Sequence, residues 1–306
     1  MALNRRIYSS QSLRVDGLGA IPVKSVSISR DRPMEPLLVM GILKGANQQQ
    51  KGPETFKVDV KAYFTSAITD AAIKTLFSKT EKGEPGEIEL TNKTGDSSFK
   101  ANVVLTNISI DSSITDFIDV SLSFQGLGDP NIKETNNGPL IPEDATANMP
   151  LVGVVVLDSS NIGAAGADLY GDTIKSLKFS FEMPVDRITT LNTAKNPSPT
   201  TTAAAAFSTA MMKQDELTLI GKPPYKSSLN VEGQSLKITA GAGNLIHNRG
   251  MTLPEIIIGA NIFKIALING ALKTFSVNQS PGEIGANYSA SYEGTHVKAL
   301  SSITYT

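Results

Sequence analysis

The stretch VKSVSISRDRPMEPL, residues 23–37, has a counterpart in IKSLKFSFEMPVDRI, residues 174–188, at a constant separation of 151 residues. The identical pairs are Lys24/Lys175, Ser25/Ser176, Ser29/Ser180 and Pro33/Pro184. Other positions keep their character, as in the acidic pair Asp31/Glu182 and the apolar pair Ile28/Phe179. Both stretches alternate apolar and polar residues, the pattern of a strand with one face on a core. The sequence therefore predicts one strand-forming unit that occurs twice.

The ends of the two halves match in the same order. The segment 105–126 aligns with 272–294 at a separation of 167 residues, which becomes 168 after one inserted residue. Phe124-Gln125-Gly126 then meets Tyr292-Glu293-Gly294. We interpret the two matches as a tandem duplication. The expected organisation is a first domain at 1–130, a linker rich in Gly, Pro and Asn at 131–150, and a second domain at 151–306.

The first half is expected to contain strands and one helix. Period-two alternation predicts strands at 55–64 and 119–126, with Phe56, Val58, Val60, Val120, Leu122 and Phe124 toward a core. Between them, apolar residues at helical spacing predict an amphipathic helix over 66–79. The segment that follows, 86–110, is typical of a hairpin with its turn near 93–97.

The second half repeats this order with differences. Strands are predicted at 173–183 and within 228–240. Thr252 and Glu255 have the spacing of a capping box, with Pro254 in the first turn, and predict a short helix over 252–260. Asn269-Gly270 predicts a hairpin turn between two apolar strands. Both halves also carry a long polar loop after their first strand, at 41–55 and 191–215.

The composition argues against most catalytic and nucleic-acid-binding classes. The 306 residues carry a formal net charge of −1 and include no Cys. The two histidines, His247 and His296, have no carboxylate at metal-ligand spacing, so solvated side chains are expected and no metal or cofactor is predicted. No Gly-rich stretch continues into a phosphate-binding GK[ST] motif. Arg5-Arg6 is too small a basic cluster to carry nucleic-acid binding. We therefore expect a protein that is not an enzyme.

The ends and the hydropathy also shape the expected location. The first residues, MALNRRIYSSQSL, lack the apolar core of a signal peptide. No apolar run approaches the length of a membrane span. The sequence therefore predicts a chain that is made and folds inside the cell.

The repeated strands resemble the bacteriophage tail tube (major tail) protein family. The likeness rests on residues 23–37 and 120–126 and their counterparts 174–188 and 288–294, and covers most of 5–130 and 150–300. The fold class expected from it is mainly β (α+β). Two tandem antiparallel β-sandwich or barrel domains of tail-tube type are expected, each with one short helix and a long loop.

The resemblance implies a structural virion protein of the tail, assembled in the host cytoplasm. Three two-domain chains would form a pseudo-hexameric ring, and stacked rings would enclose a channel for genome delivery. The implied partners are further copies of the chain and other tail proteins (sheath or tape measure, and baseplate). DNA would pass transiently without specific binding, and no membrane would be spanned.

The same resemblance assigns roles to particular residues. Ring stacking is expected to use the long loops, with the candidate interface residues Gly41, Gln48, Gln49, Lys51, Asn192, Lys195, Thr200 and Phe207. Small polar residues of the closing strands, Ser121, Ser123, Ser289 and Ser291, are the candidates for a wet channel or inter-subunit strand face.

Other functions stay open at this stage. A trimeric tail-tip or baseplate hub, a tube initiator, a tube terminator or a secretion-tube component would use the same domains in a different copy number. A carbohydrate-binding β-sandwich would expose aromatic residues, which the 6% aromatic content without Trp disfavours. An enzyme with paired carboxylates is the least favoured reading.

Overall fold

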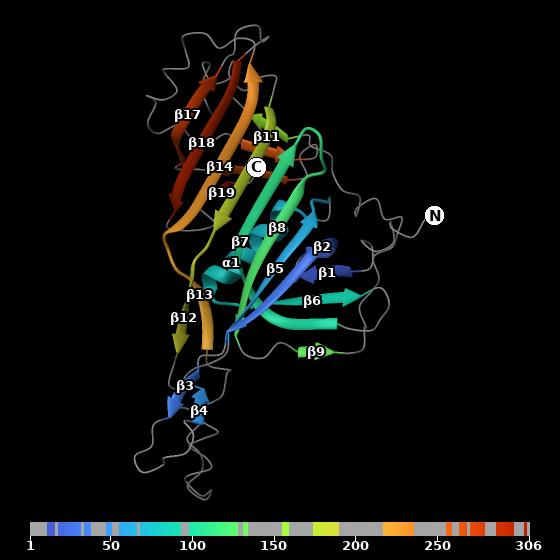
Figure 1. Ribbon diagram of the computed structural model, residues 1–306, viewed down its shortest axis with the longest axis vertical. Helices are drawn as coiled ribbons and strands as arrows, with labels where there is room; N and C mark the ends of the chain where they lie inside the picture. The colour runs from blue at the N-terminus through green and yellow to red at the C-terminus, as the bar shows by residue number, and fades with distance from the viewer. Residues whose placement is uncertain are drawn as a thin grey trace, which may run out of the picture.

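A computed structural model of the chain describes residues 11–15, 18–31, 34–37, 47–50, 55–65, 68–92, 98–127, 131–133, 155–158, 174–189, 217–235, 255–258, 263–267, 270–278, 286–296 and 303–304. One long sheet runs obliquely through the molecule, with the helix behind it and a two-stranded arm, β3–β4, projecting at one end (Figure 1). The described residues lie mostly in antiparallel strands with a single helix among them, which confirms a mainly β fold.

The first half folds into a small closed barrel. Its elements are β1 (Gln11–Val15), β2 (Leu18–Asp31), β3 (Met34–Leu37), β4 (Asn47–Gln50), β5 (Thr55–Tyr63), α1 (Asp70–Lys82), β6 (Gly86–Asn92), β7 (Ser98–Ser113), β8 (Asp119–Leu127) and β9 (Asn131–Lys133). Pairing runs β1–β2–β5–β8–β7–β6 and returns to β1, so the strands close on themselves. The long strand β7 closes the circle because its first part pairs with β6 and its later part with β8.

The alternation in β5 and β8 produces the barrel core as the sequence predicts. Phe56, Val58 and Val60 are buried between the exposed residues Lys57, Asp59 and Lys61. Val120, Leu122 and Phe124 are buried in the facing strand. Burial of these side chains supplies the main stabilisation, at about 1.5–3 kcal/mol for each large apolar residue.

Helix α1 covers the core from behind the sheet. The predicted helix is confirmed, but it begins and ends later than expected because its caps fix the ends. The Thr69 hydroxyl accepts a hydrogen bond from the Ala72 amide, and Gly83 adopts a left-handed φ of 73° after the last turn. Ile73 and Phe77 are fully buried beneath the helix, and Phe77 stacks edge-on with Phe181 of the second half.

The second half contributes β10 (Val155–Asp158), β11 (Ile174–Glu182), β12 (Val185–Thr189), β13 (Leu217–Gly221), β14 (Tyr225–Ser235), β15 (Glu255–Ile258), β16 (Phe263–Leu267), β17 (Gly270–Asn278), β18 (Ala286–His296) and β19 (Ile303–Thr304). Strands β11, β14, β18 and β17 extend the main sheet. The others form a four-stranded sheet, β10–β15–β16–β19, and a two-stranded arm, β12–β13, that contacts α1.

The prediction of a helix over 252–260 is wrong for the residues of this range that the structure describes. Glu255–Ile258 is strand β15, paired with β10 on one edge and β16 on the other. The run Ile256, Ile257 and Ile258 is β-branched and fits a doubly paired strand better than a helix. Within the described residues the second half has no helix, so the expectation of one helix in each domain is met only in the first half there.

The hairpin expected around Asn269-Gly270 is wrong as well. Strands form on both sides, but β16 pairs with β15 and β19, whereas β17 pairs with β18. Gly270 begins β17 and lies opposite Gly294. The Asn-Gly signal is local, and it is overridden here because β16 and β17 pair with other strands in two different sheets.

The two halves share one sheet. Strand β7 pairs with β11 through seven residue pairs, from Ser113↔Ser176 to Asn107↔Glu182. This joins eight strands in the order β2–β5–β8–β7–β11–β14–β18–β17. The start of the expected linker, Asn131–Lys133, is strand β9 on β7, and 134–150 lie outside the described residues. No helix in the described part of the chain is long and apolar enough to span a membrane.

Candidate assembly surface

The eight-stranded sheet contains the same four-strand order twice. Pairing runs β2–β5–β8–β7 in the first half and β11–β14–β18–β17 in the second. Equivalent strands lie at constant separations of 151, 171, 168 and 167 residues, in that order. Val58, for example, lies between Ile28 and Phe124, as Leu229 lies between Phe179 and Tyr292.

Even the irregularities recur. An extra residue interrupts β2 at Lys24, and its counterpart Lys175 interrupts β11 in the same way. A second bulge interrupts β7 at Thr106, and Lys273 occupies the equivalent bulge in β17. Bulges re-aim side chains and are specific features of a sheet rather than random defects. Two matching bulges in register are therefore stronger support for repeated units than strand order alone.

A side-chain contact at the first bulge recurs too. The Lys24 ammonium group lies 2.6 Å from a carboxylate oxygen of Asp119 and 4.2 Å from the centre of the Tyr63 ring. In the second unit the Lys175 ammonium group donates to the side-chain carbonyl of Asn287 over 3.3 Å. Asn287 stands at the position equivalent to Asp119, so the bulge lysine bridges to the same strand in both units.

The junction between the units is buried and closed at both ends. Phe179 of β11 lies opposite Ile110 of β7, and both are fully buried. Beyond the paired residues, the Met183 amide donates to the Thr106 carbonyl over 2.7 Å. At the other end the Ile114 amide donates to the Lys175 carbonyl over 3.0 Å. The junction thus joins the last strand of one unit to the first strand of the other by a complete ladder.

Each unit has one edge that enters this junction, which leaves two outer edges. The first strand of the first unit is β2, and no described strand pairs with its second edge at Ile28 and Ser29. The last strand of the second unit is β17, which pairs only with β18 among the described strands. Ile28 is 40% exposed, whereas its counterpart Phe179 is 0% exposed. Unpaired sheet edges of this kind are templates for pairing with another chain.

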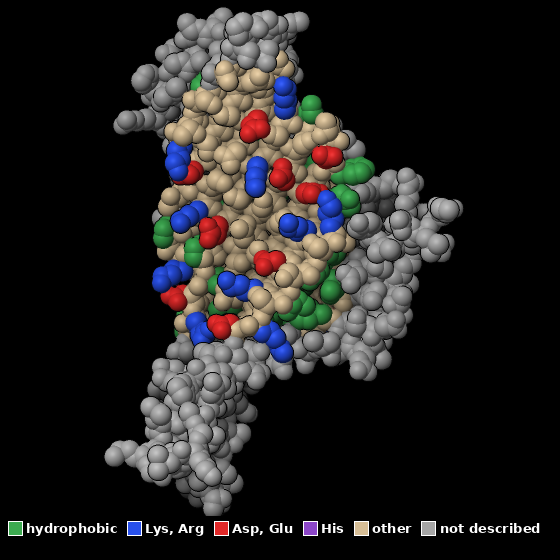
Figure 2. Space-filling view, viewed as in Figure 1, with side chains coloured by type: hydrophobic (Ala, Val, Ile, Leu, Met, Phe, Trp, Pro, Cys, Tyr) green, Lys and Arg blue, Asp and Glu red, His purple; other side chains and the backbone are tan. Residues whose placement is uncertain are grey.

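The face of the sheet opposite the core is polar from one edge to the other (Figure 2). Both signs of charge occur among its described residues: Lys24, Lys57, Lys61, Lys100, Lys175, Lys178, Lys226 and Lys273 together with Asp31, Asp59, Asp111, Asp119, Glu182, Glu232 and Glu293. Figure 2 shows the two signs interspersed rather than gathered in patches. Serines fill much of the rest, with hydroxyl pairs at 2.7 Å between Ser180 and Ser228 and between Ser276 and Ser289.

The structure places the four predicted channel-face serines together on this polar face. Ser121 and Ser123 lie in β8, opposite Lys61 and Asp59. Ser289 and Ser291 lie in β18, opposite Glu232 and Asn230. The alternation of each strand puts them on the side away from the buried residues.

The predicted stacking residues are mostly outside the described part of the chain. Gln48 and Gln49 lie in β4, opposite Pro36 and Glu35 in the projecting arm. Those that lie outside it are Gly41, Lys51, Asn192, Lys195, Thr200 and Phe207. Ile28, the exposed apolar residue of the open edge, was not among the predicted site residues. In the sequence, only the alignment of Ile28 with Phe179 pointed to this position, because the exposure of Ile28 depends on which strands are paired.

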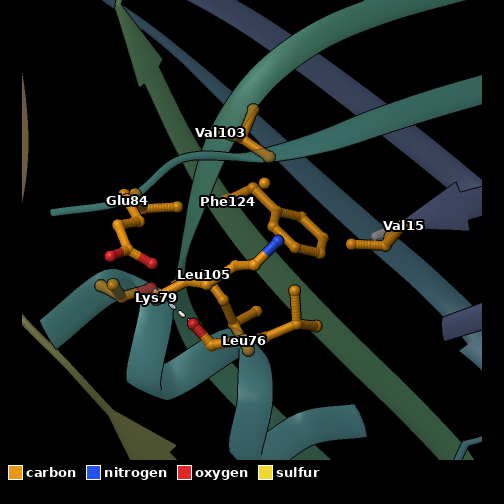
Figure 3. A pocket seen from close by; sticks show the side chains of 10 residues that line it. Val15, Leu76, Lys79, Glu84, Val103, Leu105 and Phe124 are labelled. Carbon is orange, nitrogen blue, oxygen red and sulfur yellow. Dashed lines mark hydrogen bonds between the residues drawn. The ribbon is translucent and has the colours of Figure 1, made fainter. Parts of the chain in front are cut away.

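No group of three or more His, Asp or Glu residues that could hold a metal ion gathers among the described residues. His296 lies in β18 and His247 is outside the described residues. A small gap between α1 and the barrel is lined by Leu76, Val103, Leu105 and Phe124, with Lys79 and Glu84 at its rim, as Figure 3 shows. It is filled by apolar side chains and leaves no room for a ligand.

In comparisons with known proteins, no protein-family model matches the chain, and no curated protein matches it in sequence.

Proposed function

We propose that this chain is the structural subunit of a hollow tube, the tail tube of a bacteriophage, built from stacked trimeric rings. The observation that carries the proposal is the repeated four-strand unit whose two outer edges, on β2 and β17, pair with no other strand in the described part of the chain. The duplication inferred from the sequence is supported by the matching registers and by the two matching bulges. Each half would then be one tail-tube-like domain.

Ring closure follows from how the edges are arranged. A head-to-tail contact between the β2 edge of one copy and the β17 edge of another uses two different surfaces, so it repeats from copy to copy and forms a ring when the rotation between copies closes. Closure pairs both outer edges of the eight-stranded sheet. Each chain supplies two equivalent units, so three copies give six units in one circle.

The size of such a ring can be estimated from strand spacing. Three copies of the eight-stranded sheet make a circle of about 24 strands, with a circumference of roughly 115 Å at about 4.8 Å per strand. This corresponds to a backbone diameter of about 37 Å, which widens to about 45–52 Å if the strands tilt by about 35–45°. A barrel of this width is a channel rather than a packed core.

The polar face of the sheet suits the inside of that channel. Its lysines and carboxylates occur in similar numbers, and several form ion pairs, as in Lys24–Asp119 and Lys273–Glu293. The affinity of a protein for DNA rises with the number of phosphates that the protein neutralises. A serine-rich wall with charges of both signs should therefore bind DNA weakly. On the opposite, apolar face, α1 packs against β7 and strand β13 of the arm contacts α1 and β8.

The remaining roles complete this proposal. The chain would reside in the virion tail after assembly in the host cytoplasm, next to sheath or tape-measure and baseplate proteins. The long loops, including the segment around Gln48 and Gln49, would stack one ring on the next.

Electron microscopy of the purified full-length chain tests the proposal. We expect rings or tubes with a central hole, at a ring mass of about 97 kDa for three chains of 32.4 kDa. Single rings that never stack would indicate a tail-tip hub instead of a tube. A monomer at every concentration, in the presence or absence of crowding agents, would contradict both.

A further inference from the structure

We infer that β17 of one copy pairs antiparallel with β2 of the next copy, in the register that β7 and β11 use inside the chain. The inference deepens the proposed function and rests on it. The internal junction serves as the template because it joins the same kind of strand on each side: the last strand of one unit and the first strand of the other.

The register follows from the constant separations between the units. Phe179 corresponds to Ile28 and Ile110 corresponds to Val277, so the internal pair Phe179↔Ile110 predicts Ile28 opposite Val277 of the next copy. By the same step, Ser180↔Ser109 predicts Ser29 opposite Ser276. Lys178↔Asp111 predicts Ser27 opposite Asn278.

Strand direction is consistent with this junction. The eight strands from β2 to β17 alternate in direction because every pairing between neighbours is antiparallel. The first and last of an even number of alternating strands run in opposite directions. A second copy, related to the first by rotation about the ring axis, therefore places its β2 antiparallel to β17 of the first copy.

The β2 edge also has room for the partner strand. Strand β1 pairs only with the Leu18–Pro22 part of β2. Likewise β6 pairs only with the Ser98–Val103 part of β7 and leaves the later part of that strand to β11. The partner strand would cover Ile28 in the way that β7 covers Phe179, which accounts for the difference in exposure between the two residues.

Disulfide cross-linking can read this register directly. The chain contains no Cys, so any disulfide formed after two cysteines are introduced must involve those cysteines. Ser29 and Ser276 lie seven strand intervals apart within one copy, about 34 Å at the usual spacing. A disulfide needs Cα atoms within about 7 Å, so a link between these positions can only join two copies.

The experiment compares two double variants of the full-length chain after oxidation of the assembled protein. In Ser29→Cys/Ser276→Cys the two cysteines are directly opposite in the inferred register. In the control, Ser27→Cys/Ser276→Cys, they are diagonal neighbours on the same face, about 7–8 Å apart and beyond disulfide reach. We expect covalent dimers and trimers from the first variant on a non-reducing gel, at least tenfold more than from the control.

The outcomes separate the register from the function. Rings in which only the control cross-links would show a two-residue slip and overturn the register while the proposed function stands. Rings in which neither variant cross-links would place the junction elsewhere and overturn the inference. A wild-type chain that never forms rings would contradict the proposed function itself.

A variant that assembles poorly does not end the test. The single variants Ser29→Cys and Ser276→Cys can be mixed in equal amounts, so that each copy carries one cysteine. The inferred junction then gives disulfide-linked mixed dimers that contain one of each variant. Dimers made only of one variant would contradict it.

Discussion

Ile28 and Phe179 occupy equivalent positions in two copies of one four-strand pattern, yet Ile28 is 40% exposed and Phe179 is 0% exposed. The difference does not come from their own strands, because each faces a buried apolar residue on the next strand: Val58 for Ile28 and Leu229 for Phe179. Phe179 has a second neighbouring strand in β7, whereas no described strand pairs with the corresponding edge of β2 at Ile28. The exposed isoleucine marks the edge at which the account places the next copy.

Replacing Ile28 by a charged residue should block assembly without unfolding the chain. The Ile28→Lys side chain can reach solvent in the free chain, but it would be desolvated in the junction at a cost of several kcal/mol. We expect wild-type thermal stability and no rings by sedimentation velocity and microscopy. Ile188→Lys is a matched control, because Ile188 is 42% exposed but lies on the arm strand β12, away from both open edges. Loss of rings in the control but not in Ile28→Lys would reverse the assignment.

Leu122 should be essential for folding rather than for assembly. It is 1% exposed in β8, between Val60 and Ile108. Leu122→Asp buries an unpaired carboxylate at a cost of several kcal/mol, and insoluble protein is expected. Ser121→Ala, on the opposite face of the same strand, should change the free energy of unfolding by less than about 0.5 kcal/mol. A soluble Leu122→Asp chain that assembles would show that the buried face has been assigned wrongly.

Gly126 should tolerate no side chain. A Cβ built there would collide with the ring of Phe56, which is buried and packs edge-on against Phe99. We expect Gly126→Ala to lower the free energy of unfolding by about 1–3 kcal/mol in urea denaturation, as in other overpacked cores. The double variant Phe56→Leu/Gly126→Ala should lose less than the sum of the single variants, because the shorter side chain relieves the collision. Additive losses would contradict the proposed cause.

Thr80 should couple the helix to the barrel. Its buried hydroxyl lies 3.1 Å from the Leu76 carbonyl of α1 and 3.0 Å from the Leu105 carbonyl of β7. Thr80→Val keeps the shape but leaves the Leu105 carbonyl without this donor, so a loss of about 1–3 kcal/mol is expected in thermal or urea unfolding. Thr75→Val removes a similar bond to the Ala71 carbonyl at an exposed position and should cost under about 0.5 kcal/mol. Equal losses would show that the bridge contributes nothing.

Local patterns predicted the first half well because each strand and the helix there follow a single clear signal. The alternation in β5 and β8 sets which residues are buried, and the apolar stripe from Ile68 to Phe77 sets the face of α1. The helix ends were displaced because Thr69 and Gly83 supply caps that the apolar stripe does not reveal.

Where prediction failed, pairing over long distances decided the outcome. The capping-box spacing at Thr252 and Glu255 did not produce a helix, because β15 pairs with a strand on each side. The Asn269-Gly270 hairpin did not form, because β17 pairs with β18. The repeat seen in the sequence indicated equivalent strands but not the junction between them. That junction depends on β7 meeting β11 across the boundary of the halves, which no local pattern records.

The most direct test of the central claim is an electron cryo-microscopy map of the assembled protein in which individual strands are traced. We expect a continuous wall with six equivalent junctions per ring, in which β7–β11 contacts within chains alternate with β17–β2 contacts between chains and Ile28 is buried in each. A ring or tube in which the β2 and β17 edges stay unpaired, or in which copies meet through other surfaces, would contradict the account.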